Sequence, residues 1–194
     1  MKLFSAQNIT YSINENKLFR NVSCEINSGE GLHIKGGNGS GKSTLLRIIL
    51  GITSPSKGLI QSYDQDLKIS YLGHKNAIKN YLTPVENLEL LFGGDELNVA
   101  FDWLNSFGLS HLQDELTASL SFGQQKKLAL IRVLAQSSDL LVLDEPFVGL
   151  DQTTADQINS FLAQKISQGV GLVLTSHITP MIDCAALDLG ANNA

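Results

Sequence analysis

The sequence is poor in the residues that mark several classes of protein. Its 194 residues include only two cysteines, Cys24 and Cys184, which stand far apart with no CxxC or CxxH pattern near either. This excludes a disulfide framework and a zinc-ligand pattern, so we expect small apolar thiols in a reducing compartment. Lysine and arginine number 14 against 19 aspartates and glutamates, a formal net charge of −5. The chain therefore lacks the basic balance that proteins use to bind nucleic acid.

Long hydrophobic stretches are also missing. The apolar run at 140–143 is far shorter than a membrane span, and the N-terminal residues turn polar before they reach the length of a signal peptide. No repeat, coiled-coil heptad or low-complexity segment is present. A chain of this length is expected to form one domain with one core, cytoplasmic by itself.

Short apolar stretches alternate with helical patterns along the chain. A parallel sheet covered by helices is therefore expected. The segment from about 75 to 136 is mostly helical, which predicts an insertion into a core made of residues 1–74 and 137–194. The predicted strands are at 2–11, 17–27, from Glu30, 58–63, 68–73, 139–144 and 170–175, and the predicted helices after the first are at 85–92, 98–107, 121–136 and 152–167.

A glycine-rich turn between a strand and a helix is the strongest chemical signal. The residues GGNGSGKST at 36–44 match the pattern GxxxxGK[ST]. Glycines let backbone N–H groups curl around phosphate oxygens, Lys42 adds positive charge at the β- and γ-phosphates, and Ser43 is expected to ligate Mg²⁺. The alternative is a tight turn with no ligand. The candidate nucleotide-binding residues are Gly36, Gly37, Asn38, Gly39, Ser40, Gly41, Lys42, Ser43 and Thr44.

Two neighbouring acids follow the apolar run at 140–143. In a phosphate-loop protein, Asp144 would hold the Mg²⁺ shell and Glu145 would polarise the water that attacks the γ-phosphate. Two acids after a strand are, on their own, more often a solvated strand end. Together with the glycine-rich turn, they favour a hydrolytic site.

Two further segments complete a set that occurs in a fixed order. LSFGQ at 120–124 is similar to the LSGGQ signature, and TSH at 175–177 follows another apolar strand. With these, the chain resembles an ATPase subunit of an ABC transporter. The resemblance implies that Ser121, Phe122, Gly123 and Gln124 bind the ATP of a partner subunit, that Asp151 belongs to the D-loop, and that His177 is the switch histidine. A buried core histidine is the alternative for His177.

This resemblance covers nearly the whole chain and carries implications for fold, ligands and assembly. It implies an α/β P-loop NTPase, an ABC-type nucleotide-binding domain with a RecA-like core, an antiparallel β subdomain and an inserted helical subdomain. It implies ATP and Mg²⁺ as ligands. Two copies of the chain would close head-to-tail around two nucleotides, on a membrane subunit.

His74 narrows the resemblance further. Most ABC ATPases carry a glutamine at this position, whose amide reaches the Mg²⁺ and the attacking water; a neutral imidazole nitrogen can also accept a hydrogen bond from metal-bound water. With this histidine, YLGHKNAIKNYLTPVENL at 71–88 looks like the CcmA family of cytochrome c maturation ATPases. That family implies heme export or ATP-driven release of a heme carrier. It also implies a multi-spanning membrane subunit resembling CcmB, on the cytoplasmic side of the inner membrane.

Three other readings remain open. The chain could serve another small ABC transporter, or it could be a soluble ABC ATPase, although it lacks the second motif set, the long coiled coil or the basic surface typical of that class. A non-hydrolytic nucleotide-binding module is the third, and the intact set of Lys42, Asp144, Glu145 and His177 argues against it.

Two positions depart from the superfamily pattern. Ile13 stands where an aromatic residue usually stacks on adenine, with Tyr11 two residues away, and Phe122 replaces the first signature glycine. The segment 75–95 is rich in apolar side chains, and we expect it to form a groove for a short helix of the membrane subunit. The side chains expected on this surface are Ile78, Tyr81, Leu82 and Phe92, of which about half could instead pack inward.

Overall fold

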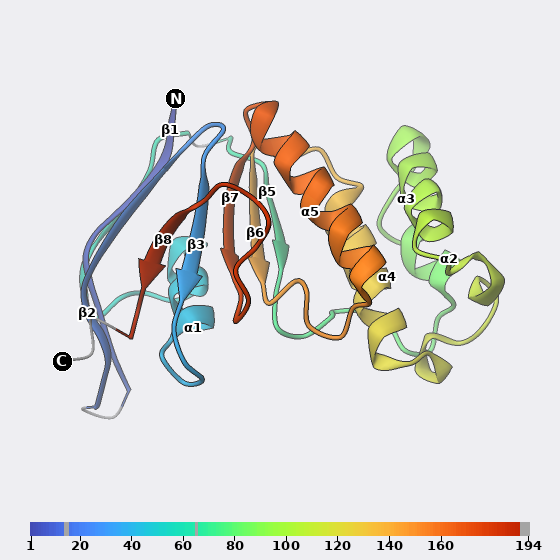
Figure 1. Cartoon of the computed structure of the whole chain (residues 1–194), viewed down its shortest axis with the longest axis horizontal. Coiled ribbons are helices and arrows are strands. Elements are labelled where there is room, and N and C mark those ends of the chain that lie inside the picture. The colour runs from blue at the N-terminus through green and yellow to red at the C-terminus, as the bar shows by residue number, and fades with distance from the viewer. Residues whose placement is uncertain (14–15, 65, 191–194) are drawn as a thin grey trace.

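The computed structural model describes residues 1–13, 16–64 and 66–190, and it contains two sheets (Figure 1). An antiparallel sheet has the strand order β2-β1-β4, formed by β1 (Lys2–Ile13), β2 (Asn16–Asn27) and β4 (Lys57–Ser62). A parallel sheet has the order β5-β6-β7-β3-β8, formed by β3 (Gly31–Lys35), β5 (Ile69–Leu72), β6 (Leu140–Asp144), β7 (Gly171–Thr175) and β8 (Ala185–Asp188).

Helices cover both faces of the parallel sheet. They are α1 (Lys42–Ile49), α2 (Pro84–Glu89), α3 (Gly94–Ser106), α4 (Phe122–Leu134) and α5 (Gln152–Ser167), with 3-10 turns at Ser110–Leu112 and Thr117–Ser119. Helix α1 lies between the two sheets, α4 and α5 lie on the opposite side of the parallel sheet, and α2 and α3 lie farther out (Figure 1). None of the described helices is long and apolar enough to cross a membrane. The predicted fold class, a P-loop core with an antiparallel β subdomain and a helical subdomain, is confirmed.

Strand β6, which lies between β5 and β7 in the parallel sheet, divides its side chains between two cores. Strand β6 sends Leu140 and Val142 into the cluster between the sheets, and it sends Leu141 and Leu143 into the cluster under α4 and α5. Successive side chains of a strand point to opposite faces, so a strand buried on both faces reads as a continuous apolar run. This is why the stretch at 140–143 predicts a central strand correctly.

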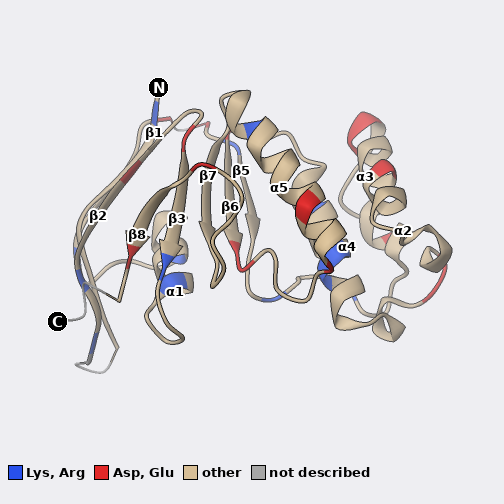
Figure 2. Ribbon diagram, in the orientation of Figure 1, with Lys and Arg blue, Asp and Glu red and all other residues tan. Residues whose placement is uncertain are grey.

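Within the described strands of the parallel sheet, Lys, Arg, Asp and Glu residues lie only at the carboxyl ends of the strands. Within its five described strands they are Lys35, Asp144 and Asp188, each the last residue of its strand. Figure 2 shows these charges at the same end of β3, β6 and β8. The carboxyl ends of parallel strands are where α/β proteins bind their ligands, so this edge is the place to look for a site.

The structure differs from the expected elements in three places. Strand β8 was not predicted, because its four mostly exposed residues carry no apolar pattern and its place depends on pairing with β3. Helix α3 begins at Gly94 rather than at 98, and α2 ends at Glu89 rather than at 92. The helices between 75 and 136 leave the sheet after β5 and return at its neighbour β6; their description as a separate insertion stays a prediction.

The two cysteines are free and partly buried. Burial raises the pKa of the Cys24 thiol to about 12 and that of Cys184 to about 11. A thiol with so high a pKa is a poor nucleophile at neutral pH, so both side chains behave as small apolar groups.

Candidate nucleotide site

The glycine-rich turn joins the carboxyl end of β3 to the first residue of α1. Gly36, Gly39 and Gly41 have positive φ angles of 150°, 79° and 97°, which residues other than glycine rarely adopt. A Cβ atom on Gly41 would also lie 2.7 Å from the Phe19 ring. The backbone of 36–41 can therefore turn at the N-terminus of α1, where free N–H groups favour an anion.

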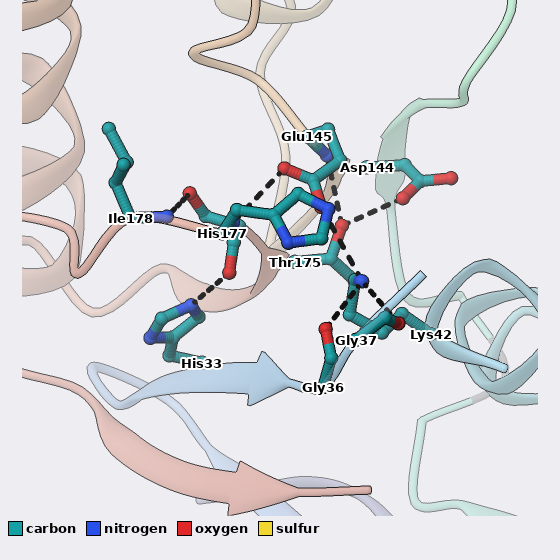
Figure 3. A network of polar contacts seen from close by, with 10 residues as sticks. His33, Gly36, Gly37, Lys42, Asp144, Glu145, Thr175, His177 and Ile178 are labelled. Atoms are coloured by element: carbon teal, nitrogen blue, oxygen red, sulfur yellow. Dashed lines mark hydrogen bonds and ion pairs between the residues drawn. The ribbon is translucent and has the colours of Figure 1, made fainter. Parts of the chain in front are cut away.

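The ammonium group of Lys42 lies inside this turn. Its Nζ donates hydrogen bonds to the carbonyl oxygens of Gly36, at 2.8 Å, and Gly37, at 3.2 Å, and it lies 3.8 Å from Glu145 Oε1 (Figure 3). The side chain is buried. A buried ammonium group beside the N-terminus of a helix creates a positive region suited to phosphate oxygens.

The two acids at the end of β6 have different environments. Asp144 is buried, and its Oδ1 accepts a hydrogen bond of 2.7 Å from Thr175 Oγ1, while its Oδ2 has no described partner. Glu145 has a φ of 49°, uncommon for a residue that is not glycine. Its backbone N–H donates to the same Thr175 Oγ1 at 2.9 Å. One threonine hydroxyl thus fixes both acids.

His177 completes this cluster from the loop after β7. Its Nε2 lies 3.3 Å from Glu145 Oε1, and its backbone N–H donates to Glu145 Oε2 at 3.3 Å (Figure 3). Two supporting contacts were not predicted from the sequence. Thr175 was noted in the TSH segment, but not its bond to Asp144, and His33, whose Nε2 lies 3.1 Å from the carbonyl oxygen of Ser176, was not noted at all. The partners in these contacts are 31 and 143 residues apart in the chain, so no local pattern indicates them.

A cavity of about 400 Å³ brings most of the predicted site residues together. The glycine-rich turn and His74, on the loop after β5, both line it. Its lining residues are Ile13, Leu18, Gly37, Asn38, Gly39, Ser40, Gly41, Lys42, Ser43, Thr44, His74, Asp144, Glu145 and His177. Residues from six separate parts of the chain therefore meet at the carboxyl edge of the parallel sheet.

An apolar end of this cavity corresponds to the expected adenine position. Ile13 and Leu18 line it, and Ile13 is 51% exposed. Tyr11 instead stacks on Phe19, with ring centroids 6.3 Å apart, and it does not line the cavity. An aliphatic surface can cover a base without the ring stacking that an aromatic residue provides.

The signature residues lie outside this cavity. Ser121 caps helix α4: its Oγ accepts from the Gln124 N–H at 3.3 Å, and Gln124 Oε1 accepts from the Ser121 N–H at 2.8 Å. Phe122 is 61% exposed, beside Gly149. Lys127 Nζ lies 2.7 Å from Asp151 Oδ2, and this contact holds the pKa of Asp151 well below its usual range. The residues of the signature and the D-loop thus lie together on one surface.

The oxygen atoms near Lys42 fit a magnesium ion. Asp144 Oδ2 is buried without a described partner, and Ser43 lines the same cavity. Carboxylate and hydroxyl oxygens at a phosphate site are the ligands that Mg²⁺ prefers in proteins. The donor set is therefore consistent with Mg²⁺ bound together with a nucleotide.

Comparison with known proteins places the sequence in a family. Residues 19–148 match the sequence profile of the ABC transporter family. The cytochrome c biogenesis ATP-binding export protein CcmA of Dechloromonas aromatica is 34% identical over 90% of this chain and 92% of its own length. The protein of the same name from Escherichia coli strain K12 is 33% identical over 91% of this chain and 90% of its own length. That from Pseudomonas syringae pv. tomato is 37% identical over 84% of this chain and 82% of its own length.

Solved structures support the fold. A dimeric ATP-binding cassette in a post-hydrolysis state, bound to ADP and Pi, is similar with a TM-score of 0.77 and 27% identity, covering 91% of this chain and 88% of that one. The structure of a metal-chelate type ABC transporter in an inward-facing conformation has a TM-score of 0.79 at 28% identity, covering all of this chain and 82% of that one.

Proposed function

Because the chain belongs to the ABC transporter family, and within it to the CcmA cytochrome c biogenesis ATP-binding proteins, we propose that it is the ATP-hydrolysing subunit of a bacterial inner-membrane complex for cytochrome c maturation. The work of the complex is heme export or ATP-driven release of a heme carrier. One observation carries this proposal: a phosphate-binding turn, two acids and two histidines meet in one cavity of a chain one third identical to CcmA proteins.

The phosphate groups of ATP are proposed to bind on the turn 36–44. Backbone N–H groups and the Lys42 ammonium face the β- and γ-phosphates at the N-terminus of α1. Ser43 and Asp144 would hold Mg²⁺, which when bound neutralises charge that develops on the phosphate oxygens. Thr175 keeps Asp144 in place by its hydrogen bond of 2.7 Å.

Glu145 is proposed as the group that accepts a proton from the attacking water. The carboxylate is largely buried and lies beside His177 and Lys42, which hold it at the γ-phosphate side of the cavity. Proton transfer to a positioned base contributes about 10²- to 10⁴-fold to such reactions. His177 and His74 are proposed to contact the γ-phosphate and the water from the two sides of the cavity.

Assembly as a homodimer is proposed from the place of the signature residues. Ser121, Phe122, Gly123 and Gln124 do not line the cavity of their own chain, although a capped helix N-terminus can bind an anion. In a head-to-tail dimer they would face the γ-phosphate on the partner subunit, and Asp151 would lie at the interface. A multi-spanning subunit resembling CcmB is proposed to hold this dimer at the cytoplasmic face of the inner membrane.

The proposal is tested by Glu145→Gln in the full chain. ATP binding should be retained, turnover should fall by about 10² or more, and ATP should hold the variant as a dimer. The control is Glu89→Gln, at an exposed position of α2, which should keep normal turnover. Radiometric phosphate release and light scattering with ATP measure the two effects. Near-normal turnover of Glu145→Gln would exclude Glu145 as the base.

The cellular role is tested by complementation. In a bacterium that lacks its own CcmA, the wild-type chain should restore c-type cytochromes, detected by heme staining, and Glu145→Gln should not. Restoration by Glu145→Gln would contradict a role for ATP hydrolysis. Failure of a well-expressed, ATP-hydrolysing wild-type chain would favour the ATPase of another small transporter.

A further inference from the structure

The loop that follows β5 lines two neighbouring cavities. His74 lines the nucleotide cavity, and residues 73–77 line a second cavity of about 380 Å³ that reaches α4. Ser43, His74 and Asp144 line both. The position of His74 therefore depends on how residues 73–77 are held in the second cavity.

Arg132 holds this loop. It lies in the last turn of α4, and its Nη1 donates to the carbonyl oxygens of Asn76, at 2.9 Å, and Ala77, at 2.7 Å. Among the described residues its hydrogen-bond partners are these two carbonyls, and no carboxylate forms an ion pair with it. Burial lowers the pKa of its guanidinium group. Placing a partly buried cation here costs free energy, so the two carbonyls must offset part of that cost.

The backbone under Arg132 is itself strained. Ala77 has a φ of 51°, in the left-handed region that residues with a side chain rarely adopt. Arg132 binds the carbonyl oxygens of the two peptide groups that flank Ala77, those of Asn76 and Ala77, which keeps the turn in this conformation. A strained turn persists only where its surroundings fix it.

The other end of α4 is connected to the same loop. Asn87 is buried; its Oδ1 accepts from the Lys79 N–H at 2.8 Å, and its Nδ2 donates to Thr117 Oγ1 at 3.1 Å. Gln125, one turn inside α4, donates from Nε2 to the Thr117 carbonyl oxygen at 3.1 Å. Backbone hydrogen bonds from Thr117 to Leu82 and from Ala118 to Asn80 strengthen this connection.

We propose that Arg132 is a positioning residue for ATP hydrolysis, through which helix α4 and the loop that carries His74 move as one body. Ser121 caps one end of α4, and Arg132 lies roughly 16 Å away near the other end. This inference rests on the proposed function, in which Ser121 contacts the ATP of the partner subunit. Engagement of that ATP would move α4, and Arg132 would carry the movement to His74 in its own nucleotide cavity.

The chemistry of this contact calls for arginine. The Arg132 Nη1 holds its two N–H donors in a fixed plane, one for each carbonyl oxygen, whereas the lysine ammonium is a point charge on a shorter, flexible stem. Arg132→Lys can keep contact with the carbonyls but holds them less rigidly, and Arg132→Met fills a similar volume but donates to neither. The three side chains therefore form a graded series.

Steady-state ATP hydrolysis by the full chain tests the proposal. Arg132→Met should lower kcat by about 10- to 100-fold, the effect of a small misplacement at a reacting group, with KM for ATP changed less than about threefold. Arg132→Lys should recover part of the loss. The control is Gln136→Ala, two residues beyond the end of α4, which removes a hydrogen bond of 3.1 Å that the Ser70 hydroxyl on β5 donates to Gln136 Oε1 and should leave kcat unchanged.

A double-mutant cycle shows whether Arg132 acts through His74. If it does, the double variant His74→Ala with Arg132→Met should have the kcat of His74→Ala alone, because the effects of substitutions at residues that act through each other do not add. A further additive fall in kcat would overturn the proposal, and so would unchanged kcat in folded Arg132→Met. If Arg132→Met does not fold, the same cycle with Arg132→Lys decides.

The same assay distinguishes failure of the proposed function from failure of this inference. A wild-type chain that hydrolyses no ATP would overturn the proposed function and this inference together. An active wild type with an inactive Glu145→Gln and a fully active Arg132→Met would overturn the inference alone.

Discussion

A single buried histidine connects the parallel sheet to the loop that carries His177. His33 is 3% exposed on β3, and its Nε2 bonds to the carbonyl oxygen of Ser176. Burial lowers the pKa of His33, although the hydrogen bond with Ser176 opposes this effect. The folded protein therefore holds this imidazole neutral at a pH where the unfolded chain takes up a proton.

We predict that this histidine makes the free energy of unfolding depend on pH. Its folded pKa lies below the unfolded value of about 6.5, so the unfolded chain binds more protons as pH falls below that value, and the folded state loses stability. His33→Gln should remove this part of the slope between about pH 7 and pH 5.5. Urea denaturation at several pH values measures it, with His111→Gln on an exposed turn as control. Equal slopes for wild type and His33→Gln would contradict the assignment.

At the residue scale, the sequence predicts best those groups whose function depends on neighbours in the chain. The turn 36–44 is recognisable because its glycines, Lys42 and Ser43 are consecutive. The contacts of Thr175 and His33 could not be predicted, because they join segments that meet only in the folded sheet. His74 is intermediate: its replacement of a glutamine was readable, but the arginine that holds its loop was not.

An ion pair joins two helices at the signature surface. Asp151 caps α5 by accepting from the Thr154 N–H at 2.8 Å, and its other oxygen pairs with Lys127 on α4. The hydrogen bond with Lys127 lowers the pKa of Asp151, followed by those with the N–H and hydroxyl of Thr154. More than half of the Asp151 side chain is exposed, so solvent weakens the pair.

We predict a small, pH-dependent loss of stability in Asp151→Asn. Asparagine keeps the capping oxygen and removes the charge, so the free energy of unfolding should fall by about 0.5–1 kcal/mol at neutral pH. Because the folded state lowers the pKa of Asp151, its charge stabilises the fold above the unfolded pKa of about 4. This stabilisation is lost as pH falls through the folded pKa. The difference should therefore shrink below about pH 4. Asp156→Asn, on the exposed face of α5, is the control; a difference that persists at low pH would exclude the charge as its cause.

Elements with strong local patterns were predictable, and elements defined by pairing were not. The buried runs of β6 and β7 and the amphipathic α5 were found close to their observed bounds. Strand β8 has the exposed sequence AALD and exists because β3 offers it a parallel edge. The start of α3 at Gly94 was missed because two consecutive glycines, Gly93 and Gly94, usually indicate a turn.

For the whole molecule, the docking surface expected on 75–95 stays a prediction, and about half of its four named side chains pack inward, as expected. Phe92 is 6% exposed in the core under α4 and α5, and Ile78 packs against the same core, because apolar residues of an inserted helical unit need a core of their own. Tyr81 remains 72% exposed, and Leu90 and Leu91, directly after α2, are exposed as well. The accessible apolar surface therefore consists of Tyr81, the partly exposed Leu82, and the end of α2.

We predict that a negative charge on this surface separates the chain from its membrane partner. A buried, unpaired carboxylate is costly in an apolar contact, so Tyr81→Glu and Leu82→Glu should move the chain to the soluble fraction of fractionated cells while ATP binding stays intact. The control is Leu59→Glu on β4, which is also well exposed but lies on the antiparallel sheet, far along the molecule from α2 (Figure 1). It should stay with the membranes. If the Tyr81 and Leu82 variants co-purified with membranes as well as Leu59→Glu does, this assignment of the docking surface would be wrong. Docking would then use a part of the molecule other than the loop that Arg132 and Asn87 hold in place.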